Sequence, residues 1–109
     1  MQLITERITY HSRSDQFHWY HLSDLPVGAR ACDEKLLRQH IRTIVDDPVA
    51  IVTFGGDLVD AISRKGDKRH LESTLAPWCW GKDAVLQVQL DYLRDELLTA
   101  PFCRKVVAV

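Results

Sequence analysis

The chain has 109 residues, of which 46% are hydrophobic and 27% are charged. This length and composition are typical of one small globular domain with a buried core, and they leave little room for a second domain. The formal net charge of −1 gives no general electrostatic attraction to nucleic acid or to a membrane surface. No apolar stretch approaches the roughly 20 residues that a membrane-spanning helix needs.

The cysteines argue against a disulfide framework and against a zinc knuckle. Cys32, Cys79 and Cys103 are odd in number, widely spaced and form no C-x-x-C pair. This pattern predicts free thiols in a reducing compartment. The amino terminus lacks the basic leader and apolar segment of a signal peptide. We therefore expect a cytoplasmic protein that has no membrane partner.

Residues 1–16 alternate only weakly between apolar and polar side chains, so we interpret them as an N-terminal extension or an edge strand. Residues 17–109 form the predicted domain. Its first strand covers residues 17–22, with alternate side chains on opposite faces. Apolar side chains are common in this run, so we expect both faces of the strand to be covered.

A helix is predicted after Asp33, which is a suitable N-cap residue. Apolar residues then recur at helical spacing, at Leu36, Leu37, Ile41, Ile44 and Val45. Pro48 stops this helix at Asp46 or Asp47. Residues 49–54 read as a second buried strand, and a strand, a helix and a strand in this order predict a right-handed unit with parallel strands.

Residues 61–82 lack periodicity and are predicted to form a long loop. Asp83 is a candidate cap for a second helix, which Pro101 ends. The apolar face of this helix would consist of Leu86, Leu90, Leu93 and Leu97. Residues 105–109 read as a third strand. The predicted fold class is therefore α/β, built from βαβ units with about three main parallel strands and two main helices.

Two aspartates, Asp24 and Asp57, each follow one of the first two predicted strands. In an open α/β sheet, ligands bind at the carboxyl ends of the strands, where two such carboxylates can converge. Carboxylate oxygens are hard ligands that suit Mg²⁺ or Mn²⁺. The sequence therefore predicts a metal site at this edge of the sheet.

The residues around these aspartates resemble two motifs of a known family. The segments are Ser23-Asp24-Leu25-Pro26-Val27-Gly28 and Gly55-Gly56-Asp57-Leu58-Val59-Asp60. They are similar to the first two blocks of the calcineurin-like metallophosphoesterases, which read D-x-H, usually within S-D-x-H-x-G, and G-D-x-x-D. The resemblance extends from about Phe17 to Val109. It implies that the chain is the amino-terminal part of a metal-dependent phosphoesterase with a partial metallophosphoesterase-like sheet.

The resemblance also implies roles for individual residues. Asp24 would ligate a first metal and Asp57 would bridge two metals, each of which would be Mn, Mg, Fe or Zn. A hydroxide activated by the two metals would then attack a phosphorus atom in line. Asp60 would orient neighbours of the site, or be an ordinary polar residue after Asp57.

Two departures from the family pattern predict weak or absent activity for this chain. Pro26 stands where the family has the histidine of D-x-H, and proline offers no ligand atom. The third block, G-N-H-E/D, and the later histidine blocks do not occur before Val109. No catalytic residue is assigned for this reason.

The long loop carries basic residues that are candidates for binding phosphate. They are Arg64, Lys65, Lys68 and Arg69. The alternative is that their side chains are simply solvated. The substrate would be a phosphoester, and a nucleic acid would bind only as such a substrate.

Two other functions are consistent with the sequence. A non-catalytic binding module derived from the same fold would use Trp78 and Trp80 as a contact surface, whereas the alternative is that these tryptophans cap the core. In an independent small α/β domain, Asp24 would be a turn residue and Asp57 a cap. We also expect self-association through an uncovered edge of the sheet.

Overall fold

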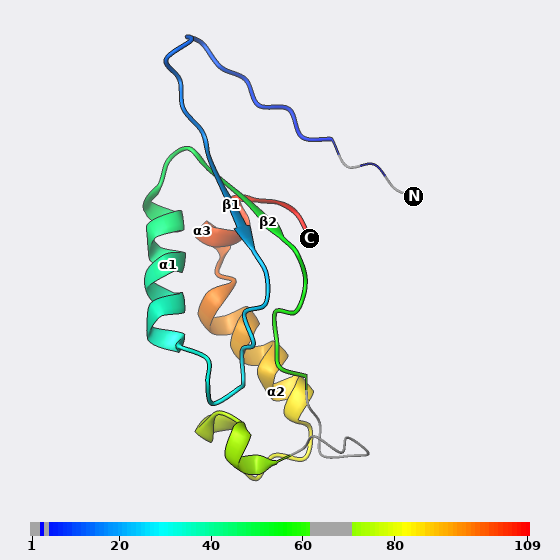
Figure 1. Cartoon of the computed structure of the whole chain (residues 1–109). Helices are drawn as coiled ribbons and strands as arrows, with labels where there is room; N and C mark the ends of the chain where they lie inside the picture. Colours follow the sequence, from blue (N-terminus) through cyan, green and yellow to red (C-terminus); the bar gives the residue numbers. More distant parts are fainter. Residues whose placement is uncertain (1–2, 4, 62–70) are drawn as a thin grey trace.

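The computed structural model describes residues 3, 5–61 and 71–109. The fold is α/β, with a sheet of three parallel strands, which are β1 (His18–Leu22), β2 (Ala50–Phe54) and β3 (Val106–Ala108). The order in the sheet is β1-β2-β3, so β2 is central (Figure 1). The predicted class and the three parallel strands are confirmed.

The first crossover contains helix α1 (Glu34–Asp46), which has nearly the predicted bounds. Asp33 caps it, because its carboxylate accepts a hydrogen bond of 2.9 Å from the Leu36 amide. The side chains of Leu37, Ile41 and Ile44 are buried against the sheet. Spacing and capping together therefore determined this helix.

The second crossover is more irregular than predicted. The chain forms two short 3₁₀ helices, η1 (Glu72–Thr74) and η2 (Pro77–Cys79), then α2 (Val85–Tyr92), a π-helical segment η3 (Leu93–Leu97) and the short α3 (Ala100–Cys103). Asp83 is not the cap of α2, because Ala84 occupies the N-cap position. Pro101 does not end the long helix either. It lies in the first turn of α3, where a proline costs no hydrogen bond.

The predicted apolar face of the second helix is also wrong at its start. Leu86 and Leu90 are 42% and 43% exposed. The buried positions recur every four residues instead, at Val85, Gln89, Leu93 and Leu97. A spacing of four exceeds the 3.6 residues of an α-helical turn, and the wider π-helical segment keeps the last two positions on the buried side.

The core lies on one face of the sheet, between the strands and the helices. It joins Val52 and Phe54 of β2 to α1, to η3 and to Phe102 of α3. The rings of Phe54 and Phe102 have centroids 6.1 Å apart. Tyr20 and Leu22 of β1 pack against the same core.

The opposite face of the sheet is open, so the expectation that both faces are covered is wrong. Trp19 is 72% exposed, and its indole Nε1 donates a hydrogen bond of 2.8 Å to Thr53 on the neighbouring strand. Neither these side chains nor His21 belongs to the core. Every described helix that contributes to the core packs against the other face of the sheet (Figure 1).

The described part of residues 1–16 is an exposed extension that contains no strand. It leaves the start of β1 and then turns back in Figure 1, so that residues 6–9 line a groove together with Ile51 of β2 and Val107 of β3. The edge-strand alternative is therefore wrong for this part of the chain. Among the described residues, no helix combines the length and the apolar character that crossing a bilayer requires.

Asp47 joins the amino ends of the strands. Its carboxylate Oδ2 lies 2.6 Å from His18 Nδ1 and accepts a hydrogen bond of 2.9 Å from the Tyr20 hydroxyl. The other oxygen accepts from the Val49 amide at 3.0 Å, and Lys105 donates to the backbone carbonyl of Asp47. Burial acts to raise the pKa of Asp47, but hydrogen bonds from His18, Val49 and Tyr20 outweigh it and hold that pKa below its ordinary value.

The substitution Asp47→Asn is expected to destabilise the protein at neutral pH, and the loss should shrink on acidification. Because folding lowers the pKa of Asp47, its contribution is present above the ordinary value of 3.8 and is lost as the pH falls through the lower folded value. Urea unfolding of both proteins between about pH 7 and pH 2 measures the difference.

Asp46→Asn is the matched control, because Asp46 is exposed and has no partner among the described side chains. It is expected to change the free energy of unfolding by less than about 0.5 kcal/mol. A loss in Asp47→Asn that did not vary with pH would contradict the role given to the ionised carboxylate.

Candidate functional site

The segments that follow β1 and β2 continue side by side beyond the ends of the strands. The amide of Asp24 donates to the carbonyl of Gly56 at 3.2 Å, and the amide of Leu25 donates to the carbonyl of Asp57 at 2.9 Å. Val27 forms a parallel bridge with Val59. The backbone positions of Asp24 and Asp57 are therefore adjacent at the carboxyl edge of the sheet.

Both aspartates have a left-handed backbone, with φ of 53° at Asp24 and 52° at Asp57. Aspartate is one of the few non-glycine residues that adopt this conformation readily. Both side chains are exposed, and neither carboxylate has a hydrogen bond or ion pair in the described part of the chain. The alternatives of a turn hydrogen bond at Asp24 and a helix cap at Asp57 are therefore wrong. The two carboxylates are available to a ligand.

The described residues offer few ligands for a metal besides Asp24 and Asp57. Pro26 follows Leu25 at the edge of the site and contributes no ligand atom. Within residues 3, 5–61 and 71–109, no three His, Cys, Asp or Glu side chains form a group that could hold a metal ion. Two carboxylates suit a hydrated cation such as Mg²⁺, which keeps several waters. They do not fit a closed centre of two metals, which needs more protein ligands.

Asp60 lies on the side of the site that faces η2. It is half-buried, and its amide donates to the carbonyl of Val27 at 2.9 Å. Burial raises the pKa of the Cys79 thiol, and the charges of Glu34 and Asp60 add to this effect although a hydrogen bond from Gln89 opposes it. Asp60 is thus close enough to Cys79 to affect its titration. The predicted phosphate-binding residues, Arg64, Lys65, Lys68 and Arg69, lie outside the described residues.

Gln89 of α2 contacts both segments that form the site, and no role was predicted for it. Its side chain is fully buried, and its Oε1 accepts a hydrogen bond of 3.0 Å from the amide of Ala61, four residues after Asp57. Its amide group packs directly against Gly28, which has a φ of +98°. A buried glutamine on the apolar side of a helix is the signal that could have identified this contact.

Gly28 connects the site to η2. Its carbonyl accepts a hydrogen bond of 2.8 Å from the amide of Ala76, and the next residue, Ala29, forms an antiparallel bridge with Leu75. Gln89 Nε2 also lies 4.0 Å from the sulfur of Cys79. The segments after β1 and β2 are thereby fixed to η2 and α2.

Neither strand histidine replaces the ligand that Pro26 lacks. His18 is bound to Asp47 at the amino end of the sheet, and His21 Nδ1 lies 2.9 Å from Thr53 Oγ1 on the open face. His40 is exposed and shares with Asp24 a shallow groove of about 240 Å³. His18 and His21 thus have partners other than the two aspartates.

The cysteines are free thiols, as predicted. Burial is the main cause that raises the pKa of Cys32, and the negative charges of Glu34 and Asp33 raise it further. Its thiol donates to the carbonyl of Leu25 at 3.3 Å. A protonated thiol is a poor nucleophile, so the structure gives no basis for cysteine chemistry at this site.

Trp78 has a structural role. Its ring stacks on Tyr92 with centroids 4.2 Å apart, and its Nε1 donates a hydrogen bond of 2.7 Å to Glu34 of α1. The Tyr92 hydroxyl also donates to Glu34, at 2.8 Å. Trp78 therefore fixes η2 and α2 to the start of α1, which confirms the packing alternative for this residue.

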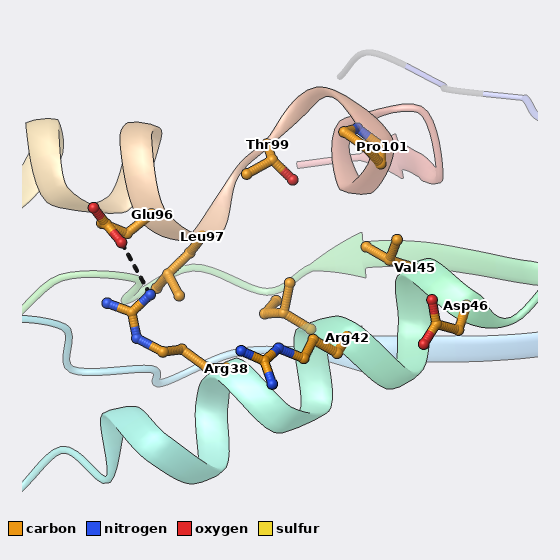
Figure 2. A pocket seen from close by; sticks show the side chains of 9 residues that line it. Arg38, Arg42, Val45, Asp46, Glu96, Leu97, Thr99 and Pro101 are labelled. Carbon is orange, nitrogen blue, oxygen red and sulfur yellow. Dashed lines mark hydrogen bonds and ion pairs between the residues drawn. The ribbon is translucent and has the colours of Figure 1, made fainter.

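A cavity of about 250 Å³ lies between α1 and η3, away from the two aspartates (Figure 2). At its mouth, Arg38 of α1 forms an ion pair of 3.0 Å with Glu96 of η3. The Arg38 guanidinium also lies over the ring of Tyr92, 5.4 Å from the centroid. These groups bind each other, so the cavity is part of the contact between α1 and η3.

Comparison of the chain with protein-family models, with curated proteins and with solved structures finds no match in any of the three. The resemblance to the calcineurin-like metallophosphoesterases therefore rests on the two motifs, their order and their spacing.

The substitution Gly28→Ala is expected to reduce the free energy of unfolding by about 3 kcal/mol. A methyl group there would overlap the Gln89 side chain and would also have to adopt a positive φ. Chemical denaturation of both proteins measures the loss.

Gly56→Ala separates the two causes. Gly56 has a φ of +102°, similar to that of Gly28, but a Cβ there would have no neighbour within 4 Å. This control should cost about 1 kcal/mol, which is the backbone cost alone. Equal losses in the two variants would disprove a close contact between Gly28 and Gln89.

Proposed function

We propose that the chain is the amino-terminal part of a metal-dependent phosphoesterase of the calcineurin-like type, and that Asp24 and Asp57 bind one hydrated divalent cation. The observation that supports this best is a pair of exposed carboxylates that have no partner among the described residues and lie on adjacent backbone segments. An exposed carboxylate without such a partner adds little to the stability of the fold, whereas two carboxylates on adjacent segments can serve as ligands for a hard cation.

The ligand set favours Mg²⁺ or Mn²⁺ over Zn²⁺ or Fe. Oxygen ligands and water suit the first two, whereas imidazole suits the other two. The motif position that would supply imidazole is Pro26. A bound cation would supply positive charge to a phosphoester oxygen. Asp24 and Asp57 would hold it, and the phosphoester, including one in a nucleic acid, would complete its shell.

Hydrolysis by this chain is proposed to be weak or absent. Efficient cleavage of a phosphoester needs an activated nucleophile and an acid that protonates the leaving group. With Pro26 in place of histidine, the two motifs supply two carboxylates and no imidazole. The proposed function of the chain is therefore cation and phosphate binding.

Calorimetric titration with Mn²⁺ tests the proposal. The wild-type chain should bind with micromolar affinity, and Pro26→His should strengthen binding about tenfold, or about 1.4 kcal/mol, because it restores a third ligand. Asp57→Asn should abolish binding. Asp46→Asn, which removes an exposed carboxylate far from the site, should leave it unchanged.

Absence of heat from the wild type and from Pro26→His would refute the metal site. It would favour the alternative of a non-catalytic binding module, for which the loss of a ligand at Pro26 is expected. In that case Trp80, which is exposed beside η2, is the residue to replace with alanine in a search for a lost partner.

Asp57→Asn is also expected to leave the metal-free protein as stable as the wild type or slightly more stable. The Asp57 carboxylate accepts no hydrogen bond from any described residue, and asparagine tolerates the same left-handed backbone. Removing one of two adjacent negative charges relieves their repulsion. Thermal unfolding in the presence of a chelator measures the change, and a clear fall in Tm would identify a structural role for Asp57.

A further inference from the structure

The cavity between α1 and η3 has polar groups on its wall that the fold does not use. Arg42 of α1 lines this cavity of about 250 Å³, and Thr99 lies on the wall across from α1 (Figure 2). Thr99 is the N-cap residue of α3, but its side chain makes no capping hydrogen bond. Neither side chain has a hydrogen bond or ion pair within the described part of the chain. A guanidinium and a hydroxyl both donate hydrogen bonds, so both are available to a ligand.

The rest of the cavity wall is mainly apolar. It includes the side chains of Ile41, Val45, Leu97 and Pro101. An engineered protein cavity of about 150 Å³ holds a benzene molecule, so this cavity is large enough for one ring or a short branched chain. Apolar walls that carry a few polar groups are typical of sites for small molecules. The body of a ligand in this cavity would therefore be apolar.

The wall formed by α1 is fixed by contacts of Arg38, one turn before Arg42. The Arg38 guanidinium pairs with Glu96 at 3.0 Å and lies 5.4 Å from the centroid of the Tyr92 ring. The Tyr92 hydroxyl donates in turn to Glu34 at 2.8 Å. These contacts join the two sides of the cavity, so the cavity is preformed. A preformed site binds a ligand with a smaller loss of conformational freedom.

The opposite wall contains a π-helical segment. Glu96 and Leu97 both line the cavity, and both belong to η3. Such segments are rare and occur frequently at functional sites. Here the segment brings a buried leucine and an ion-paired glutamate to the same cavity.

The charges on the wall favour a carboxylate over a phosphate. Glu96 neutralises Arg38, so Arg42 and Asp46 are the charged lining residues that have no partner within the described residues. The fork of a guanidinium matches the two oxygens of a planar carboxylate. A phosphate group carries nearly two negative charges at pH 7, and the second charge would increase its repulsion from Asp46 and Glu96. A ligand with a single negative charge therefore fits best.

We propose that this cavity binds a small molecule that has one carboxylate and an apolar body. The carboxylate pairs with Arg42, and the apolar body lies against Ile41, Val45 and Leu97. The site is independent of the proposed cation site, because Asp24 and Asp57 do not line this cavity.

Titration of the full chain with sodium benzoate, followed by NMR, tests the proposal. A chelator is present, so that benzoate cannot bind through a metal at Asp24 and Asp57. The wild type should bind benzoate with a Kd of about 1 mM or lower, and the shifted amide signals should come from α1 and η3. Benzamide has nearly the same shape without the charge, and it should bind about tenfold more weakly because it forms no ion pair with Arg42.

Arg42→Gln should also weaken the binding of benzoate about tenfold, and it should fold normally because Arg42 is exposed. Lys35→Gln is the matched control. Lys35 is an exposed cation on the same helix that does not line the cavity, so the affinity should not change. Val45→Phe is a second variant, which should block binding by filling the cavity without a change of charge. Circular dichroism establishes that each variant is folded.

Four results would overturn the proposal. The first is that neither benzoate nor 3-methylbutanoate, a branched aliphatic carboxylate, binds at about 20 mM. The second is equal affinity for benzoate and benzamide. The third is tighter binding of inorganic phosphate than of benzoate, which would indicate an anion site that does not select an apolar body. The fourth is full affinity in folded Arg42→Gln.

Discussion

The candidate site depends on the backbone pairing that continues past the ends of β1 and β2. Hydrogen bonds between residues 24–27 and 56–60 keep the two segments parallel where most sheets separate into independent loops. This pairing makes Asp24 and Asp57 neighbours although 32 residues separate them in the sequence. It also places Asp60 toward η2. Without it, the two motifs would be unrelated turns on the surface.

The parts of the fold that follow from local signals could be predicted from the sequence. Asp33 and Pro48 delimit α1 because a cap and a proline act within a few residues. The buried face of α2 could not be predicted, because the π-helical segment that follows it changes the spacing of the buried side chains. The open face was missed for a different reason. An apolar strand indicates that its side chains can be buried, but only the other elements decide whether they are.

The site, too, could be predicted only in part from the sequence. The positions of Asp24 and Asp57 at the carboxyl ends of strands follow from the order of strands and motifs. That their carboxylates lack partners within the described part of the chain is a property of the whole fold. The contact of Gln89 with Gly28 could be predicted only in part, because a glutamine in line with Val85 and Leu93 indicates a buried polar contact but does not identify its partner. Only a glycine leaves the space that the buried amide occupies.

Gln89 links the edge of the sheet, where a ligand would bind, to helix α2. Its hydrogen bond to Ala61 connects the segment that carries Asp57 to α2. The edge of the sheet therefore depends on the second crossover for one of its contacts. A ligand that binds the folded edge and not the unfolded chain adds its binding free energy to the stability of the domain. Any such ligand would thus protect α2 from local unfolding, although it touches no residue of that helix.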